Sequence, residues 1–128
     1  MCIAETIDSS PTLQVDSSSA WRNWLECNGQ KEKVIWLIVY HKTSKTPSVH
    51  WHDAIENALC YGWVDSKAKG RDKESCYLKF TPRNPKSKWG ERSKERAVRM
   101  TAHGLMTEHG QRLIDLAKRS GKWVEDRA

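Results

Sequence analysis

The sequence has few cysteines, and it lacks the short motifs that mark the common catalytic sites. Cys2, Cys27, Cys60 and Cys76 form no CxxC pair, which argues against a zinc site and a disulfide framework. No Gly-x-Ser-x-Gly, phosphate-binding glycine loop or HExxH is present, so hydrolase, nucleotide-binding and metalloprotease signatures are missing. We therefore favour a protein that is not an enzyme, and we expect no catalytic residue, no metal and no cofactor.

The sequence also lacks a long hydrophobic run. Its longest, residues 34–40, is far shorter than the roughly 20 residues that a membrane span needs. The N-terminus has no charged stretch followed by an apolar run of about 7–15 residues, so we expect no secretory signal. Unpaired thiols favour a reducing compartment. These features predict a cytoplasmic protein without a transmembrane segment.

Tryptophan and positive charge are abundant. Seven tryptophans among 128 residues predict an aromatic-rich core, since each large aromatic side chain can bury about 150–250 Å². The 22 lysines and arginines outnumber the 16 acidic residues, which gives a net charge of +6. Such a charge suggests an anionic partner: nucleic acid, a lipid head group or an acidic ligand. The alternative is a charge that only keeps the protein soluble.

The chain length fits one domain, predicted over residues 20–124 and followed by a short tail at 125–128. Residues 1–19 are polar and serine-rich and show no sustained hydrophobic period, so we expect a mobile N-terminal arm. Residues 12–15 offer the alternative of a short edge strand.

Hydrophobic periodicity predicts the elements of this domain. Four helices are expected: one from the serines at 17–19 to Gly29, one from Pro47 to Gly62, one from Ser87 to about Ala102, and one from Thr107 to Gly121. Residues 33–41 are apolar on both faces and are expected to form the central strand. Residues 63–69 and 75–81 are expected to form an antiparallel hairpin. The predicted fold class is α+β, with a small, mainly antiparallel sheet packed against about four helices.

Two groups of residues are candidate binding sites. The first is a polar pocket in which Arg83 contacts an anionic ligand, Asp65 orients it, and two tryptophans form the walls; its predicted members are Trp63, Asp65, Arg71, Arg83, Ser87 and Trp89. The structural alternative is an ion pair of Asp65 with Arg83 that ties the hairpin to the following helix. A further hypothesis makes Asp65 a catalytic base, which needs a concave site and a shifted carboxylate pKa.

The second group is basic and predicts nucleic-acid binding, because lysine and arginine near exposed aromatic residues can hold a phosphate backbone and stack a base. Between Arg83 and Arg99 there are seven basic residues and two acidic ones, and the hairpin adds more. The predicted contacts are Lys67, Lys69, Arg71, Lys73, Lys79, Lys86, Lys88, Arg92 and Arg96. The alternative is a solvated helix face.

Several blocks, in this order, resemble the YdeI/OmpD-associated family, also called the bacteriocin-protection family. They are Trp21-x-x-Trp24-Leu25, residues 34–37, the block Ala58-Leu59-Cys60-Tyr61-Gly62-Trp63-Val64-Asp65-Ser66, residues 80–83, Ser87-x-Trp89, Gly104-x-Met106, Gly110, and Ala117-x-x-x-Gly121-x-Trp123. The resemblance implies a link to bacteriocin or antimicrobial-peptide resistance and to an outer-membrane porin, with no established reaction. It favours a stress-tolerance protein that acts by binding an anionic ligand or a protein partner.

Overall fold

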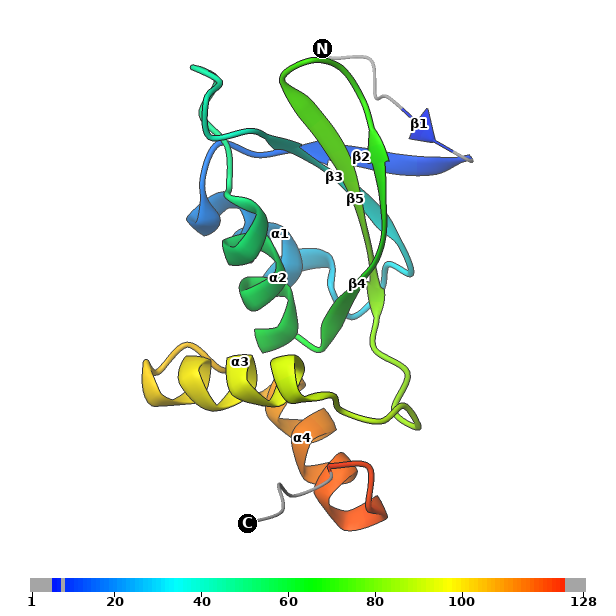
Figure 1. The fold of residues 1–128 in the computed structure, drawn as a ribbon. Helices are drawn as coiled ribbons and strands as arrows, with labels where there is room; N and C mark the ends of the chain where they lie inside the picture. The colour runs from blue at the N-terminus through cyan, green and yellow to red at the C-terminus, as the bar shows by residue number, and fades with distance from the viewer. Residues whose placement is uncertain (1–5, 8, 124–128) are drawn as a thin grey trace.

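The computed structural model describes residues 6–7 and 9–123 (Figure 1). Within them the chain forms five strands and four helices. In order these are β1 (Thr6–Ile7), β2 (Ser10–Gln14), α1 (Ser18–Asn28), β3 (Ile35–Tyr40), α2 (Trp51–Cys60), β4 (Trp63–Gly70), β5 (Ser75–Pro82), α3 (Glu91–Ala102) and α4 (Glu108–Ser120). The α+β prediction is confirmed. None of the helices in the described part of the chain is both long and apolar enough to cross a membrane.

The five strands form one sheet in the order β1-β2-β3-β5-β4, with β3 in the middle as predicted. β2 runs parallel to β3, and every other neighbouring pair is antiparallel. A parallel pair needs a crossover connection, which α1 supplies between β2 and β3. Ser17 caps α1 through its side chain, which accepts a hydrogen bond from the Ala20 N–H.

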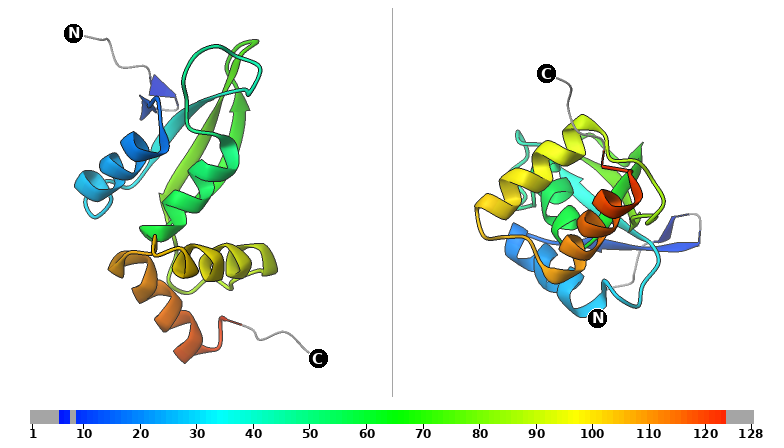
Figure 2. Two further views of the ribbon diagram at one scale, coloured as in Figure 1. Left: turned by 90° about the vertical axis from the view of Figure 1, so that its left-hand side faces the viewer. Right: turned by 90° about the horizontal axis from the view of Figure 1, so that it is seen from below.

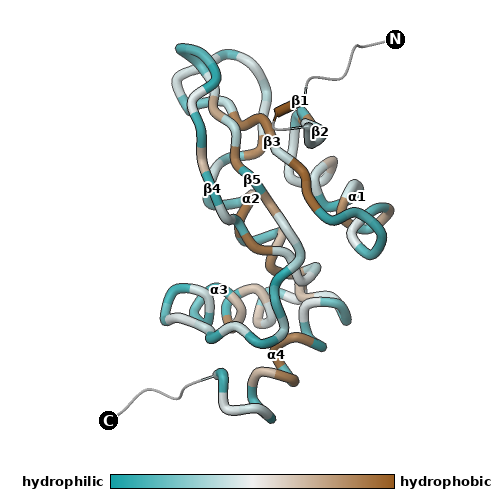
Figure 3. Tube along the Cα trace, turned by 90° about the vertical axis from the view of Figure 1, so that its right-hand side faces the viewer, coloured by the Kyte–Doolittle hydropathy of each residue, from teal (hydrophilic) through white to brown (hydrophobic). Residues whose placement is uncertain are grey.

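The main core lies between the sheet and helices α1 and α2, on one side of the sheet (Figure 2). From β3 it takes the alternate residues Ile35, Leu37 and Val39, which therefore share one face. Trp21 of α1 and Trp63 of β4 are almost fully buried in it, as the tryptophan content predicted. Along the trace, β3 is hydrophobic, whereas much of β4 is hydrophilic (Figure 3).

A second, smaller cluster packs α3 and α4 together beyond the end of α2 (Figure 1). Its buried members are Leu59, Trp89, Ala97, Ile114 and Ala117. Leu59 is the contribution of α2, so this helix belongs to both clusters. Trp89 and Trp123 join as an isolated parallel bridge, in which the Trp89 N–H donates to the Lys122 carbonyl at 2.9 Å.

Part of the segment predicted as a mobile arm belongs to the sheet. Residues Thr12, Leu13 and Gln14 of β2 pair with β3, which agrees with the alternative of a short strand there. β2 is not the outermost strand, because β1 flanks it. Residues 1–5 and the predicted tail at 125–128 lie outside the described residues.

Two helices begin later than predicted. α2 starts at Trp51 rather than near Pro47, because the Ser48 hydroxyl accepts the Tyr40 N–H at 3.0 Å and the adjacent Val49 is buried. These contacts hold the preceding residues extended. α3 starts at Glu91 rather than after Ser87, and its N-cap is Gly90. The bridge made by Trp89 keeps the backbone extended up to that point.

A register shift between Asp65 and Lys67 changes the direction of the β4 side chains. Asp65 is opposite Phe80 and Lys67 is opposite Lys79, so Ser66 is an extra residue, as in a β-bulge. Residues that face each other across two strands share a side of the sheet. Asp65 therefore lies on the helix side with Phe80, whereas Lys67 lies on the opposite side with Lys79.

Candidate functional site

A cleft of about 210 Å³ lies where the loop after α1, the turn between α2 and β4, the loop after β5, and α4 meet. Trp63 and Arg83, two residues of the predicted pocket, line it. We call it the Arg83 cleft. The other ionisable residues of its wall include Glu32, Lys33, His109 and Arg112. Lys33, Arg83 and Arg112 outnumber the single carboxylate, so the wall is positively charged.

The turn at Gly62 brings α4 against the start of β4. Gly62 has φ of +82°, a left-handed conformation that glycine adopts without a steric penalty. A side chain there would also meet Leu113, whose Cδ1 would lie 3.0 Å from a Cβ atom. The Gly62 carbonyl accepts the Arg83 N–H at 2.8 Å. One glycine thus sets the positions of Arg83 and of the helix that carries Arg112.

Arg83 is held by contacts on several sides. Its side chain is only 9% exposed, and its Nη2 donates to the Lys88 carbonyl at 3.0 Å. The guanidinium carbon lies 4.0 Å from the centre of the Trp89 ring. Burial lowers the pKa of Arg83, and the negative charge of Asp65 partly opposes that shift. The guanidinium is therefore oriented by its neighbours and is shielded from much of the solvent.

Two polar atoms of the cleft residues are buried without a hydrogen-bond partner. They are Nε of Arg83 and Nδ1 of His109; among the described residues only Trp36 Nε1 shares this condition. A buried polar group without a partner costs about 1–3 kcal/mol. His109 stacks against Tyr61 at a centroid distance of 6.5 Å, which fixes the ring but leaves Nδ1 unbonded. Both residues line the same cleft, so two of the buried polar atoms that lack a hydrogen-bond partner belong to its wall.

The structure brings together only part of the predicted pocket. Trp63 is 1% exposed, and its Nε1 donates to the Gly29 carbonyl at 2.9 Å, so it packs as a core residue that also borders the cleft. Trp89 lies beneath Arg83 and against Trp123, with ring centroids 5.3 Å apart, and it does not line the cleft. It supports Arg83 rather than forming a wall.

Asp65 and Ser87 also lie outside the cleft lining. Within the described chain no ion pair of 4.0 Å or less joins Asp65 to Arg83, so the predicted tie between hairpin and helix is a longer-range electrostatic effect. Because Asp65 does not line the cleft, the cleft does not supply the concave site that a catalytic base would need. The Ser87 hydroxyl donates to the Asn84 carbonyl at 2.9 Å and closes a turn.

Arg71 belongs to a separate network at the far end of the hairpin. It follows the eight-residue strand β4, so a distance on the order of 25 Å separates it from Trp63. Its Nη1 donates to the Ser75 hydroxyl at 3.0 Å and pairs with Asp72 at 3.1 Å. It also reaches the Tyr40 hydroxyl at 3.4 Å. These contacts order the hairpin turn.

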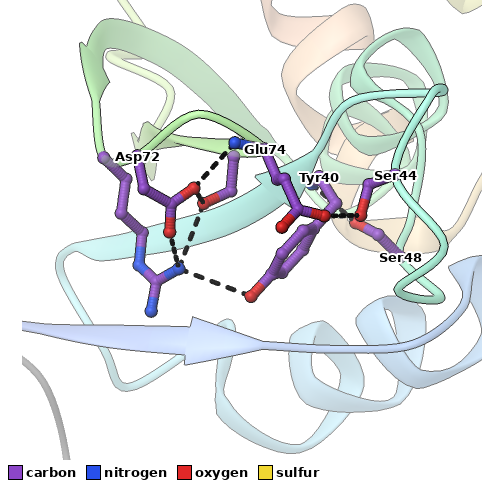
Figure 4. Close-up of polar contacts among 7 residues, drawn as sticks. Tyr40, Ser44, Ser48, Asp72 and Glu74 are labelled. Carbon is purple, nitrogen blue, oxygen red and sulfur yellow. Dashed lines mark hydrogen bonds and ion pairs between the residues drawn. The ribbon is translucent and has the colours of Figure 1, made fainter.

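The same network fastens the turn to the loop after β3, as Figure 4 shows. The Ser44 hydroxyl donates to the Glu74 carboxylate at 2.9 Å, and the His41 N–H donates to the Glu74 carbonyl at 2.8 Å. The Asp72 carboxylate accepts the Glu74 N–H at 2.9 Å. Serine and backbone hydrogen bonds lower the pKa of Asp72. These hydrogen bonds connect the hairpin turn to the loop after β3.

The nine residues predicted to contact nucleic acid fall into two groups. Five belong to the hairpin: Lys67, Lys69, Arg71, Lys73 and Lys79. Four belong to the loop before α3 or to α3 itself: Lys86, Lys88, Arg92 and Arg96. On α3, ion pairs of Lys94 with Glu91 and of Arg99 with Glu95 and Glu56 reduce the charge that this helix presents.

Sequence reasoning missed Lys33, His109 and Arg112. They come from a loop and a helix about 80 residues apart, and no spacing in the sequence links them to Arg83. It also missed that His41, His50 and His52 border one cleft of about 400 Å³. His50 occupies the N-cap position before α2, so the helical spacing expected between His50 and His52 does not apply. No group of three or more metal-binding side chains in the described residues is arranged to hold an ion.

A family model matches residues 13–113 and describes a domain of unknown function (DUF8412). The chain belongs to this family. The DUF8412 match runs from β2 into α4 and includes every residue that lines the Arg83 cleft. Comparison with curated proteins and with solved structures finds no match.

Proposed function

We propose that this protein is not an enzyme but a binding protein, which takes a small anion bearing a carboxylate or phosphate group in the Arg83 cleft. The observation that carries the proposal is the buried Arg83 side chain, whose Nε has no hydrogen-bond partner. Arginine binds carboxylate and phosphate through paired donors in a fixed fork. One donor of Arg83 is already engaged with Lys88, and the rest of its hydrogen-bonding capacity suits an oxyanion.

The wall of the cleft supports the same ligand class. Lys33 and Arg112 are exposed and add two positive charges beside Arg83. The only negative charge among the residues that line the cleft is that of Glu32. Nδ1 of His109 offers another polar atom that lacks a partner. A volume of about 210 Å³ limits the bound group to a small molecule or to the charged end of a larger one.

The resemblance to the YdeI/OmpD-associated family supports placing this binding activity in stress tolerance of the bacteriocin-protection type. Cytoplasmic location is part of the proposal, and the free thiols of Cys27, Cys60 and Cys76 support it. A net charge of +6 argues against direct capture of a cationic antimicrobial peptide. A small anion fits the charge better.

Titration calorimetry at constant ionic strength tests the proposal, with inorganic phosphate and citrate as the two probes. We expect one of them to bind, and we expect Arg112→Gln and Lys33→Gln each to weaken binding about threefold to tenfold. Both side chains are exposed, so neither change should unfold the protein. Lys45→Gln, in an exposed loop outside the cleft, is the matched control. Binding of neither probe, or equal weakening by the control, contradicts the proposal.

A further inference from the structure

The sheet has a second face, opposite α1 and α2, which we call the outer face. The strand register places Trp36 opposite Lys79 and Ile38 opposite Tyr77 on this side. On the other flank of β5, the register places Lys67 opposite Lys79 and Lys69 opposite Tyr77. Lysines from β4 and β5 therefore gather on one surface of the hairpin. Lys67 and Lys69 are exposed there.

Lys67 and Lys79 are directly opposite each other, which is an unfavourable arrangement for two positive charges. Neither forms an ion pair of 4.0 Å or less with a carboxylate of the described residues. Lys79 instead places its ammonium 5.7 Å from the centre of the Trp36 ring. A like-charge pair without an acidic partner departs from the rules that stabilise a sheet, and such departures are expected at functional surfaces.

The positive charge continues along the hairpin. Lys67, Lys69 and Arg71 are two residues apart, so they repeat at about 6.6 Å along the strand. Arg71 lies over the Tyr77 ring at 5.9 Å, and the exposed Lys73 follows in the turn. Each strand of duplex DNA carries one phosphate per 3.4 Å of helix axis. A regular row of cations on the hairpin therefore faces a regular row of negative charges when it lies along a nucleic-acid backbone.

The outer face suits a phosphate backbone better than exposed bases or a membrane. Trp36 is fully buried with Tyr77 at its edge, 6.2 Å between ring centroids, so it offers no open ring on which a base could stack. In the described part of the chain the exposed large hydrophobic residues are Trp51, Val98 and Leu105, and none belongs to β4 or β5. Apolar side chains that enter the lipid strengthen membrane-surface binding beyond what the cations alone supply, and the hairpin offers no exposed large one among the described residues.

We infer that the outer face of the hairpin binds the backbone of nucleic acid without reading its sequence. Lys67, Lys69 and Lys79 supply the main phosphate contacts. Arg71, engaged with Asp72 and Ser75, and Lys73 extend the surface toward the turn. This surface is separate from the Arg83 cleft, so the two binding activities are independent.

Fluorescence anisotropy with labelled 20-nucleotide single strands and duplexes tests the inference, at about 50 and 200 mM salt. We expect binding at the lower concentration that weakens at least tenfold at the higher, because phosphate contacts release bound cations. We expect Lys67→Glu with Lys69→Glu to weaken binding at least tenfold and to reduce the slope of log affinity against log salt by about 2. Sequence changes in the probe should alter affinity little.

Lys31→Glu with Lys118→Glu is the matched control. It makes the same change in net charge at exposed positions outside the hairpin. We expect it to weaken binding much less than the hairpin variant, and we expect Arg112→Gln to leave nucleic-acid binding unchanged. Melting curves establish that each variant is folded. Equal weakening by both double variants, or no binding at about 50 mM salt, overturns the inference.

Vesicles containing phosphatidylserine provide the remaining comparison. If the protein binds them at lower concentration than either oligonucleotide, and the hairpin variant abolishes that binding, the surface is a membrane contact and the inference is wrong. A phosphate or citrate titration of the hairpin variant tests anion binding in the Arg83 cleft separately. The affinity should equal that of the unmodified protein.

Discussion

The guanidinium of Arg83 stacks on the ring of Trp89 at 4.0 Å, in a contact between the end of the hairpin and the segment that leads into α3. Trp89 in turn lies against Trp123, within the cluster that joins α3 and α4. The Trp89 side chain therefore connects the end of the hairpin to the cluster between α3 and α4, next to the Arg83 cleft. The stack therefore orients the proposed anion contact and stabilises the fold.

A double-mutant cycle tests the stack. Arg83→Met and Trp89→Leu should each destabilise the protein, but their combination should cost about 1–2 kcal/mol less than the sum, because a desolvated cation–π contact is lost once. The free energies of unfolding come from urea titrations. Arg92→Met, at an exposed position of α3, is the control for Trp89→Leu, and we expect those two changes to be additive. Additivity in the first pair contradicts a specific stack.

Arg22 is expected to be a structural residue. Its Nη1 donates to Asn57 Oδ1 at 2.9 Å, and its Nη2 donates to the Leu105 carbonyl at 2.8 Å. Because Asn57 is buried, Arg22→Met leaves its amide oxygen without this donor and should lower the free energy of unfolding by about 1.5–3 kcal/mol. Arg22→Lys should recover part of the loss. Arg119→Met, an exposed arginine of α4, should change stability by under about 0.5 kcal/mol.

Gly110 is expected to tolerate no side chain. A Cβ atom there would lie 2.5 Å from the Cys60 carbonyl oxygen and 2.6 Å from the Met106 sulfur, so α4 would have to move away from α2. We expect Gly110→Ala to cost about 1–3 kcal/mol, or more if the helices cannot adjust. Gly90→Ala, where nothing lies within 4 Å, is the control. Similar melting temperatures for the two variants would show that α4 packs less closely than described.

The cysteines should react in order of exposure. Burial raises the pKa of the Cys60 thiol, although a hydrogen bond with Arg22 partly opposes this, and burial also raises the pKa of the Cys76 thiol. In a Cys2→Ser background, we expect Ellman's reagent at pH 7.5 to label the exposed Cys27 first and Cys60 only on unfolding. Labelling of Cys60 in the folded protein as fast as Cys27 would contradict this order.

The same burial predicts a loss of stability in alkali. Above about pH 8.5, the ordinary pKa of a cysteine thiol, Cys60 loses its proton in the unfolded chain but keeps it in the folded one. The unfolded state then binds fewer protons, so the free energy of unfolding falls as the pH rises. Burial also raises the pKa of Tyr61, which acts in the same direction. Urea titrations between pH 8 and 10 should show a shallower fall for Cys60→Ala.

Most of the fold follows from local patterns in the sequence. The apolar run at 34–40 contains the central strand, and the alternation at 75–81 covers β5 except for its last residue, Pro82. The starts of α2 and α3 could not be predicted, because contacts made by Ser48 and Trp89 with distant segments hold the preceding residues extended. The parallel pairing of β2 with β3 likewise depends on the position of α1, which no local pattern specifies.

The candidate site could be predicted only in part. Arg83 and Trp63 adjoin in the fold because β4 and β5 form a hairpin, which the sequence indicates. Arg71, a predicted member of the pocket, lies at the opposite end of the hairpin, because the whole of β4 separates it from Trp63. Lys33 and Arg112 reach the cleft through tertiary packing alone. The sequence thus predicts which cleft residues adjoin across a hairpin, but it does not predict which residues of distant loops and helices join them.

The extra residue at Ser66 has a consequence for insertions and deletions in β4. With strict alternation after Asp65, Ser66 would occupy the outer position and the two lysines that follow would turn toward the helices. A strand lacking Ser66 would alternate regularly and still direct Lys67 and Lys69 outward. Removal of any other single residue from Lys67 to Gly70, with loss of the bulge, would either delete Lys67 itself or turn Lys67 toward the helices. We therefore expect related chains to differ in length within this strand at Ser66 rather than at its neighbours.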